Sequence, residues 1–328
     1  MNALELVCPA GTPAALRAAV DSGADAVYLG FRDATNARNF PGLNFSRPEL
    51  EEGIAYAHGK GCRIFLAINT FPAAGNAAPW RQAVDDGASF GVDAVILADI
   101  GLLDYATRKH PGLRRHLSVQ ASASNPESIH FYQNAFDVKR VVLPRVLTID
   151  EIAALNKEIT VETEVFVFGG LCVMAEGRCS LSSYVTGQSP NTNGVCSPAC
   201  SVRYEEDEAG RMISKLGDFT INAFDPGEPA GYPTLCKGRF VANGKTSYLF
   251  EDPVSLNASS ILPELAAAGV TGLKIEGRQR GKAYIAEVVS SFRRAVDTMA
   301  DGASVETDLM RIAEGQRKTT GAYQKAWR

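Results

Sequence analysis

Cysteine is the residue type whose spacing carries the most chemical information in this chain of 328 residues. Two of the seven cysteines, Cys8 and Cys62, stand alone, and the other five fall between residues 172 and 236 with the spacing C-x6-C-x16-C-x3-C-x35-C. In an intracellular chain, clustered thiols indicate metal or redox chemistry more often than disulfides. Segment 172–250 is therefore the first candidate for a functional site.

The ligand chemistry of this segment is all sulfur. It contains no CxxC pair, which disfavours a zinc ribbon or a thioredoxin-like motif, and none of the four histidines lies in it. Thiolates bind iron–sulfur clusters and zinc alike, and composition does not separate the two. Five cysteines leave one spare if four bind metal. The alternative is that they are small buried apolar side chains.

Composition bounds the fold and the partners. The chain is 45% hydrophobic and 21% charged, which is typical of a globular protein. It is long enough for a (β/α)8 barrel of about 250 residues plus an insertion, or for two medium domains. The net charge of −4 disfavours a broad grip on nucleic acid. No signal peptide is recognisable and no apolar run approaches the ~18 residues of a spanning helix, so we expect a cytoplasmic protein without a membrane span.

Eight short apolar runs alternate with stretches of helical periodicity. Near-continuous apolar runs such as AVILAD and VFVFG are typical of parallel strands buried on both faces. Eight recurrent units favour a closed (β/α)8 TIM-like barrel over an open sheet. The expected strands are Leu4–Cys8, Ala24–Gly30, Arg63–Asn69, Asp93–Asp99, Leu117–Ala121, Lys139–Arg145, Val161–Phe168 and Gly272–Glu276. The expected helices include Pro13–Ser22, Arg47–Lys60, Pro79–Phe90, Asp150–Lys157 and Pro263–Ala268.

The cysteines lie between the seventh and eighth expected strands, in a segment rich in Ser, Asn, Gly and Pro. A loop of this length needs something to hold it together, and a metal centre would do so. We therefore divide the chain into barrel strands 1–7 (1–171), a cysteine-rich insertion (172–250), strand 8 with the last helix (251–300) and a C-terminal tail (301–328).

Active sites of such barrels lie at the carboxyl ends of the strands. The polar residues expected there, together with the arginine of the NARNF motif, are Arg38, Asn69, Gln120, Arg145, Lys274, Glu276 and Arg278. Arginine suits bidentate recognition of carboxylates. For each arginine the alternative is a structural ion pair, and for Asn69 and Gln120 it is a satisfied polar residue in the upper core. Asp99, at the end of the fourth strand, is expected to cap a helix.

Several longer motifs carry a resemblance to a known family. LVCPAG, NARNFPGLNFS, SVQASASN, VVLPRVL, the stretch from GGLCVMAEGRC to GVCSPAC, YPTLCKGR and LKIEGRQR resemble peptidase family U32. The resemblance runs from Leu6 to about Arg294 and looks closest to the branch that functions in oxygen-independent ubiquinone biosynthesis. In that branch four cysteines hold a [4Fe–4S] cluster, and their motif positions match Cys172, Cys179, Cys196 and Cys236. Cys200 is an additional thiol and the substitute ligand for Cys236.

The resemblance also implies a function. Proteins of that branch hydroxylate the ring of a ubiquinone precursor without O2, as a heterodimer with a homologous UbiV-like subunit, with prephenate as the implied oxygen donor. A lipid-carrier protein of the quinone pathway is a further expected partner. Because prephenate carries two carboxylates, Arg145, Arg278 and Arg38 are candidate clamps for this small molecule.

Three alternatives stay open at this stage. An RNA-modifying hydroxylase of the same family would need a basic groove, which the acidic net charge disfavours. A non-catalytic cluster-binding subunit would leave the chemistry to its partner. A peptidase has little support, because the chain contains neither GxSxG nor HExxH.

Overall fold

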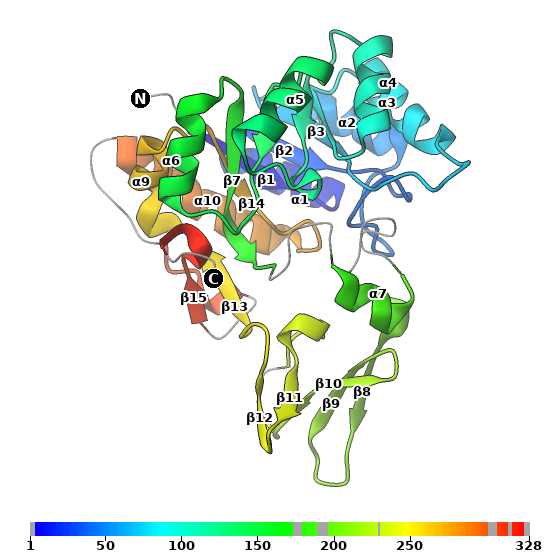
Figure 1. Ribbon diagram of the computed structural model, residues 1–328, viewed down its shortest axis with the longest axis vertical. Helices are drawn as coiled ribbons and strands as arrows, with labels where there is room; N and C mark the ends of the chain where they lie inside the picture. The colour runs from blue at the N-terminus through cyan, green and yellow to red at the C-terminus, as the bar shows by residue number, and fades with distance from the viewer. Residues whose placement is uncertain are drawn as a thin grey trace.

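The fold is a closed barrel of eight parallel strands surrounded by helices, with an elongated insertion below it (Figure 1). The computed structural model describes residues 4–172, 179–188, 196–228, 230–300, 307–313 and 317–324. Each barrel strand pairs with the next along the chain, and β14 closes the ring by pairing with both β1 and β7. The expected (β/α)8 barrel is confirmed. Its strands are β1 (Glu5–Pro9), β2 (Ala26–Leu29), β3 (Arg63–Ile68), β4 (Ala94–Leu97), β5 (Arg115–Leu117), β6 (Arg140–Val142), β7 (Glu162–Gly170) and β14 (Gly272–Ile275).

Several of the outer helices begin at a side chain that caps them. Thr12 caps α1, and Ser46 forms a capping box with Glu49 at the start of α2. Asp99 caps α4 as expected, because its carboxylate accepts the N–H of Leu102 at 2.9 Å. The outer helices are α1 (Pro13–Asp21), α2 (Arg47–His58), α3 (Ala78–Phe90), α4 (Ile100–Lys109), α5 (Pro126–Phe136), α6 (Ile149–Glu158), α9 (Leu262–Ala267) and α10 (Lys282–Ala300).

The fifth strand lies earlier than the apolar run suggested. We expected Leu117–Ala121, but β5 spans Arg115–Leu117 and the chain then turns through the short 3-10 helix Val119–Ala121. Ser118 starts this turn, since its hydroxyl accepts the N–H of Gln120. The prediction was wrong here because a serine cap overrides the strand propensity of the following valine. The turn carries Gln120 over the mouth of the barrel.

The insertion between β7 and β13 (Val254–Asn257) is built mainly of antiparallel strands. After α7 (Ser180–Thr186) come a three-stranded sheet of β8 (Val202–Glu206), β9 (Met212–Leu216) and β10 (Phe219–Phe224), and a hairpin of β11 (Arg239–Ala242) and β12 (Lys245–Tyr248). β13 then returns antiparallel to the end of β7. The insertion therefore joins the barrel at the carboxyl ends of the strands, beside the expected site.

The C-terminal segment folds back on the barrel. β15 (Arg317–Thr319) pairs with β13, and the Tyr323 hydroxyl donates to the carbonyl oxygen of Phe166 in β7 at 2.6 Å. This buried bond ties the tail to the strand that leads into the insertion. Among the described helices, none combines the length and apolar character that a membrane crossing requires.

Candidate functional site

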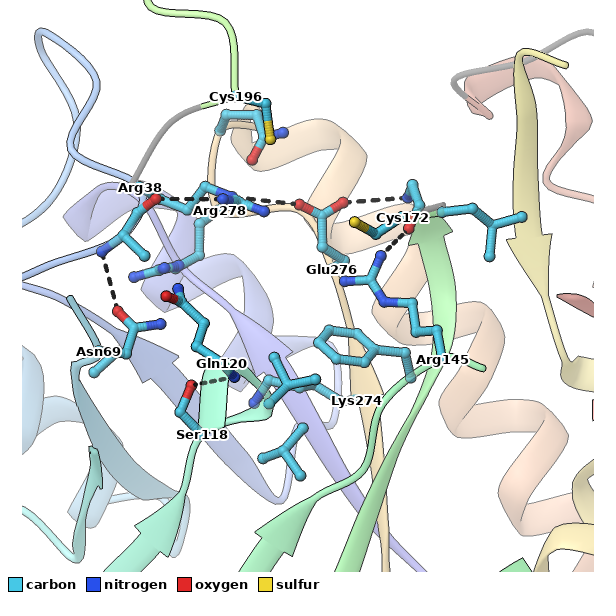
Figure 2. A pocket seen from close by; sticks show the side chains of 18 of the residues that line it. Arg38, Asn69, Ser118, Gln120, Arg145, Cys172, Cys196, Lys274, Glu276 and Arg278 are labelled. Atoms are coloured by element: carbon cyan, nitrogen blue, oxygen red, sulfur yellow. Dashed lines mark hydrogen bonds and ion pairs between the residues drawn. The ribbon is translucent and has the colours of Figure 1, made fainter. Parts of the chain in front are cut away.

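One cavity of about 240 Å³ opens at the carboxyl ends of the barrel strands. All seven polar residues expected at the strand ends line it, and Figure 2 shows them pointing toward a common space. They come from the β2–α2 loop, the end of β3, the turn after β5, the loop after β6 and the end of β14. The seven are Arg38, Asn69, Gln120, Arg145, Lys274, Glu276 and Arg278.

The four cysteines that match the family motif line the same cavity. Cys172 follows β7, Cys179 is the N-cap of α7, Cys196 precedes a 3-10 turn, and Cys236 lies in the 3-10 helix Leu235–Lys237. All four are half-buried, and none of the described cysteines forms a disulfide. Cys200 is exposed and is absent from the lining. The fold thus gathers four thiols from separate parts of the chain.

Charged groups of the cavity lining shift the pKa values of two of its members, Cys236 and Arg38. Burial raises the pKa of the Cys236 thiol, Thr234 and Lys237 lower it, and the thiols of Cys196 and Cys179 raise it further. Burial lowers the pKa of Arg38, but Glu276 and then the thiols of Cys196 and Cys172 raise it, with a net increase.

The donor set of the cavity is compatible with an iron–sulfur cluster. In the described part of the chain, no three Cys, His, Asp or Glu side chains lie close enough to share one metal ion. A four-iron cluster binds each thiolate through a different iron atom, so its ligands stand farther apart than those of one zinc ion. The donors facing the cavity are soft thiols, which suit an iron–sulfur cluster.

Glu276 joins three parts of the cavity wall. Its Oε1 lies 3.8 Å from Nε of Arg38, and its Oε2 accepts the N–H of Gly170 at 3.2 Å. Burial raises the pKa of Glu276, but Arg38, Arg145 and the Gly170 N–H lower it more, so the carboxylate stays ionised. Arg145 donates from Nη1 to the carbonyl oxygen of the same Gly170 and stacks on Phe166 at 3.9 Å from the ring centroid.

Arg278 and Lys274 form the cationic floor of the cavity. Arg278 is 5% exposed and donates from Nη1 to Oδ1 of Asn36 at 2.6 Å, and burial lowers its pKa to about 10. Lys274 Nζ lies 3.7 Å from the centroid of the Tyr28 ring and donates to Glu164 at 2.6 Å. Glu164 balances the charge of Lys274, whereas Arg278 bonds to a neutral amide, so the buried Arg278 favours an anionic ligand in the cavity.

A chain of ion pairs continues from Lys274 through the barrel interior. Glu164 Oε2 lies 3.1 Å from Nη1 of Arg140, and Nη2 of Arg140 lies 2.5 Å from Glu5. Lys274 therefore takes part in a structural network as well as lining the cavity. The alternative we gave for the arginines, a structural ion pair, likewise applies in part to Arg38.

The two amide side chains differ in their partners. Asn69 Oδ1 accepts the N–H of Ala37 at 3.0 Å, so Asn69 holds the loop that carries Arg38. Gln120 Oε1 is buried and has no hydrogen-bond partner in the described structure. An unsatisfied acceptor that lines a cavity is suited to a donor group on a ligand.

Sequence reasoning missed several residues of the lining. Tyr28, Ser118, Thr234, Lys237 and Gln279 all face the cavity. Lys237 and Thr234 flank Cys236 and Gln279 follows Arg278, so adjacency to those residues could have found them. Tyr28 lies within an apolar strand run, where only the inward-facing register of β2 shows its role.

Comparisons with known proteins place the chain in a family. It is 32% identical to the tRNA hydroxylation protein P of Escherichia coli (strain K12) over 95% of this chain and 72% of that protein. It is 33% identical to an uncharacterized protease of Methanocaldococcus jannaschii over 92% of this chain and 67% of that protein. It is 29% identical to the 23S rRNA 5-hydroxycytidine C2501 synthase of Escherichia coli (strain K12) over 95% of this chain and 42% of that protein.

The family assignment covers almost the whole chain, including the barrel, the insertion and the tail. The family model of peptidase family U32 matches residues 11–326. The match spans both groups of residues that meet at the cavity, namely the strand-end cations and the four thiols. This chain therefore belongs to peptidase family U32.

Proposed function

We propose that this chain holds a [4Fe–4S] cluster on Cys172, Cys179, Cys196 and Cys236 and takes part in the oxygen-independent hydroxylation of an aromatic ring. The observation that carries the proposal is that four thiols share one cavity with two buried cations, Lys274 and Arg278. Four thiolates are the usual ligand set of such clusters. Hydroxylation is also the activity in the names of two relatives, the tRNA hydroxylation protein and the 23S rRNA 5-hydroxycytidine synthase.

The residues of the cavity wall would have distinct tasks. The bound cluster would supply electron transfer or Lewis-acid chemistry at the mouth. Arg278 and Lys237 would bind the carboxylates of an anionic oxygen donor, for which prephenate is our candidate. Gln120, whose buried Oε1 lacks a partner, would accept a hydrogen bond from the ring substrate. Below this space, the buried side chains of Lys274 and Glu164 are paired with each other in the barrel interior.

Our first candidate for the ring substrate is a ubiquinone precursor. The support is the resemblance of the cysteine motifs and YPTLCKGR to the quinone branch of the family. A second cavity, in the insertion, is lined by Glu205, Glu206, Asp225 and Glu228. Lys215 pairs with Glu205 and Arg239 with Glu228, so Glu206 and Asp225 are the carboxylates that would repel phosphate. The net charge of −4 also disfavours the binding of RNA.

The second candidate substrate is RNA, and the named relatives favour it. Of the three relatives reported above, at 29–33% identity, two bear the names of a tRNA hydroxylation protein and an rRNA synthase, and the third is named as a protease. Both candidates share ring hydroxylation, and the test below separates them.

The proposal includes a homologous UbiV-like subunit in a heterodimer. Most of the large apolar side chains that are exposed in the described chain lie on α7 and the rest of the insertion, among them Tyr184, Phe219 and Val241, which are 80%, 43% and 73% exposed. A concentration of exposed apolar side chains on one part of a molecule is typical of a protein–protein interface. A lipid-carrier protein of the quinone pathway is a further partner in the same proposal.

Anaerobic purification and a deletion strain test the proposal together. We expect a brown protein with about four iron and four sulfide per chain. In anaerobically grown cells lacking the gene, we expect ubiquinone to fall while hydroxylated nucleosides of tRNA and rRNA, measured by mass spectrometry, stay unchanged. The reverse outcome would replace the quinone precursor by RNA. A colourless zinc protein, or no change in either product, would contradict the proposal.

A further inference from the structure

The end of β7 leaves the barrel in an unusual way. Gly170 pairs with Ser255 of β13, on the side of β7 away from β14, and the chain continues directly to Cys172. Gly169 has a φ of +119°, and a Cβ at this position would lie 2.7 Å from Cβ of Glu276. Only glycine allows both this backbone conformation and this close approach. Gly169 therefore lets the strand pass close to Glu276, three residues before the first cysteine of the site.

Two side chains hold the peptide groups of Gly170 from within the cavity. The Glu276 carboxylate accepts its N–H at 3.2 Å, and Nη1 of Arg145 donates to its carbonyl oxygen. Figure 2 shows both side chains converging on the backbone next to Cys172. Arg145 lies in the β6–α6 loop and Glu276 directly follows β14. The two hydrogen bonds therefore fix Gly170 relative to two other barrel strands.

Glu276 also connects this backbone to the opposite wall. Its other oxygen faces Arg38 at 3.8 Å, and the thiols of Cys196 and Cys172 lie close enough to Arg38 to affect its pKa. The carboxylate therefore stands between the loop of Arg38 and the strand end that carries Cys172. A carboxylate with these partners already in place is poorly suited to be a ligand of an anionic substrate.

We propose that Glu276 and Arg145 are positioning residues that clamp Gly170 and thereby aim the Cys172 thiol at the cluster, rather than substrate ligands. This inference rests on the cluster of the proposed function. It corrects our own expectation for the two residues, which the strand-end position alone assigned to substrate binding. In this arrangement the backbone of Gly170 connects Glu276 and Arg145 in the cavity wall to Cys172, the proposed cluster ligand.

The test compares Glu276→Ala with Glu276→Gln in anaerobically purified protein. The alanine variant loses the acceptor for the Gly170 N–H, so we expect release of iron to a chelator to be about ten-fold faster than in the wild type. The glutamine variant keeps an acceptor oxygen and should stay within about three-fold. Gln120→Ala is the matched control, because Gln120 lines the same cavity without contacting Gly170. The electron paramagnetic resonance spectrum of the reduced cluster should change in Glu276→Ala alone.

A second measurement does not need the cluster. In the iron-free protein, hydrogen exchange at the Gly170 amide should be about ten-fold faster in Glu276→Ala than in the wild type, with Gln120→Ala unchanged. Circular dichroism and the melting temperature check that each variant is folded. If Glu276→Ala releases iron and exchanges this amide at wild-type rates, the clamp is refuted while the cluster stands. If the wild type binds no iron, the cluster proposal fails, and the exchange rate alone then decides whether the clamp on Gly170 exists.

Discussion

The barrel and the insertion hold their functional side chains in opposite ways. In the barrel, Glu164 and Lys274 are buried and paired, and they sit on strands that hydrogen-bond to neighbours on both sides. In the insertion, Cys179, Cys196 and Cys236 lie at a helix N-cap, a bend and a 3-10 turn. Strand pairing on both sides holds the side chains of the barrel, whereas the geometry of these three thiols depends on a few turns. A shared metal centre would give the insertion the cross-links that its own secondary structure does not supply.

The largest effect should come from the thiols. Cys172→Ala, Cys179→Ala, Cys196→Ala and Cys236→Ala should each remove nearly all bound iron, because each breaks one corner of a four-thiolate site. Iron analysis and visible absorption of anaerobically purified protein measure this. Cys62→Ala, at the far end of the barrel, and Cys200→Ala, whose thiol is exposed, are the controls and should keep the colour. If Cys200→Ala loses the iron and Cys236→Ala keeps it, the ligand set we propose is wrong.

The next effect tests the barrel. Glu164→Ala leaves Lys274 and Arg140 without the carboxylate that both contact, so we expect the free energy of unfolding to fall by about 3–5 kcal/mol. Urea denaturation followed by circular dichroism measures it. Glu205→Ala removes an exposed pair with Lys215 on the insertion and should leave the midpoint unchanged. If Glu164→Ala and Glu205→Ala lose the same free energy of unfolding, the buried ion pairs of the barrel contribute no more to stability than an exposed pair does.

A smaller effect is expected on how the stability of the barrel depends on pH. Burial, and then Arg140 and Arg114, hold the pKa of His116 well below its usual value. As the pH falls below about 6.5, His116 therefore takes up a proton in the unfolded chain before it does so in the folded protein. The stability that neutral His116 contributes is complete above that pH and is lost below it. Between pH 6.5 and 5 we expect a slope of up to about 1.4 kcal/mol per pH unit.

His116→Gln should reduce that slope. Equilibrium unfolding at a series of pH values measures it, with the interval kept above the range in which carboxylates titrate. Parallel curves for the wild type and His116→Gln would show that another group controls the slope.

The clamp on Gly170 lies at the junction of the barrel and the insertion. Hydrogen exchange at the Gly170 amide therefore reports on whether contacts in the barrel wall also order the start of the insertion.

Sequence reasoning succeeded where local pattern controls structure. Apolar runs predicted seven of the eight barrel strands at nearly their observed bounds, and the strand-end rule predicted polar residues that line the cavity. It failed where a single side chain redirects the backbone, as at Ser118, and where antiparallel strands of the insertion lack a continuous apolar pattern. β8 is mostly exposed, with the sequence VRYEE, so it shows little alternation to detect.

What the sequence by itself determined is the type and order of the chemistry: eight strands in a ring, cations at their ends and a set of thiols in one insertion. The family resemblance added which four thiols belong together. Only the tertiary structure decided that these thiols face the same cavity as the cations, that Cys200 does not, and that Glu276 and Arg145 bond to Gly170. The physical reason is that residues such as Cys172, Glu276 and Arg38 meet through strand closure and a returning insertion, and contacts across such sequence separations leave no local pattern in the chain.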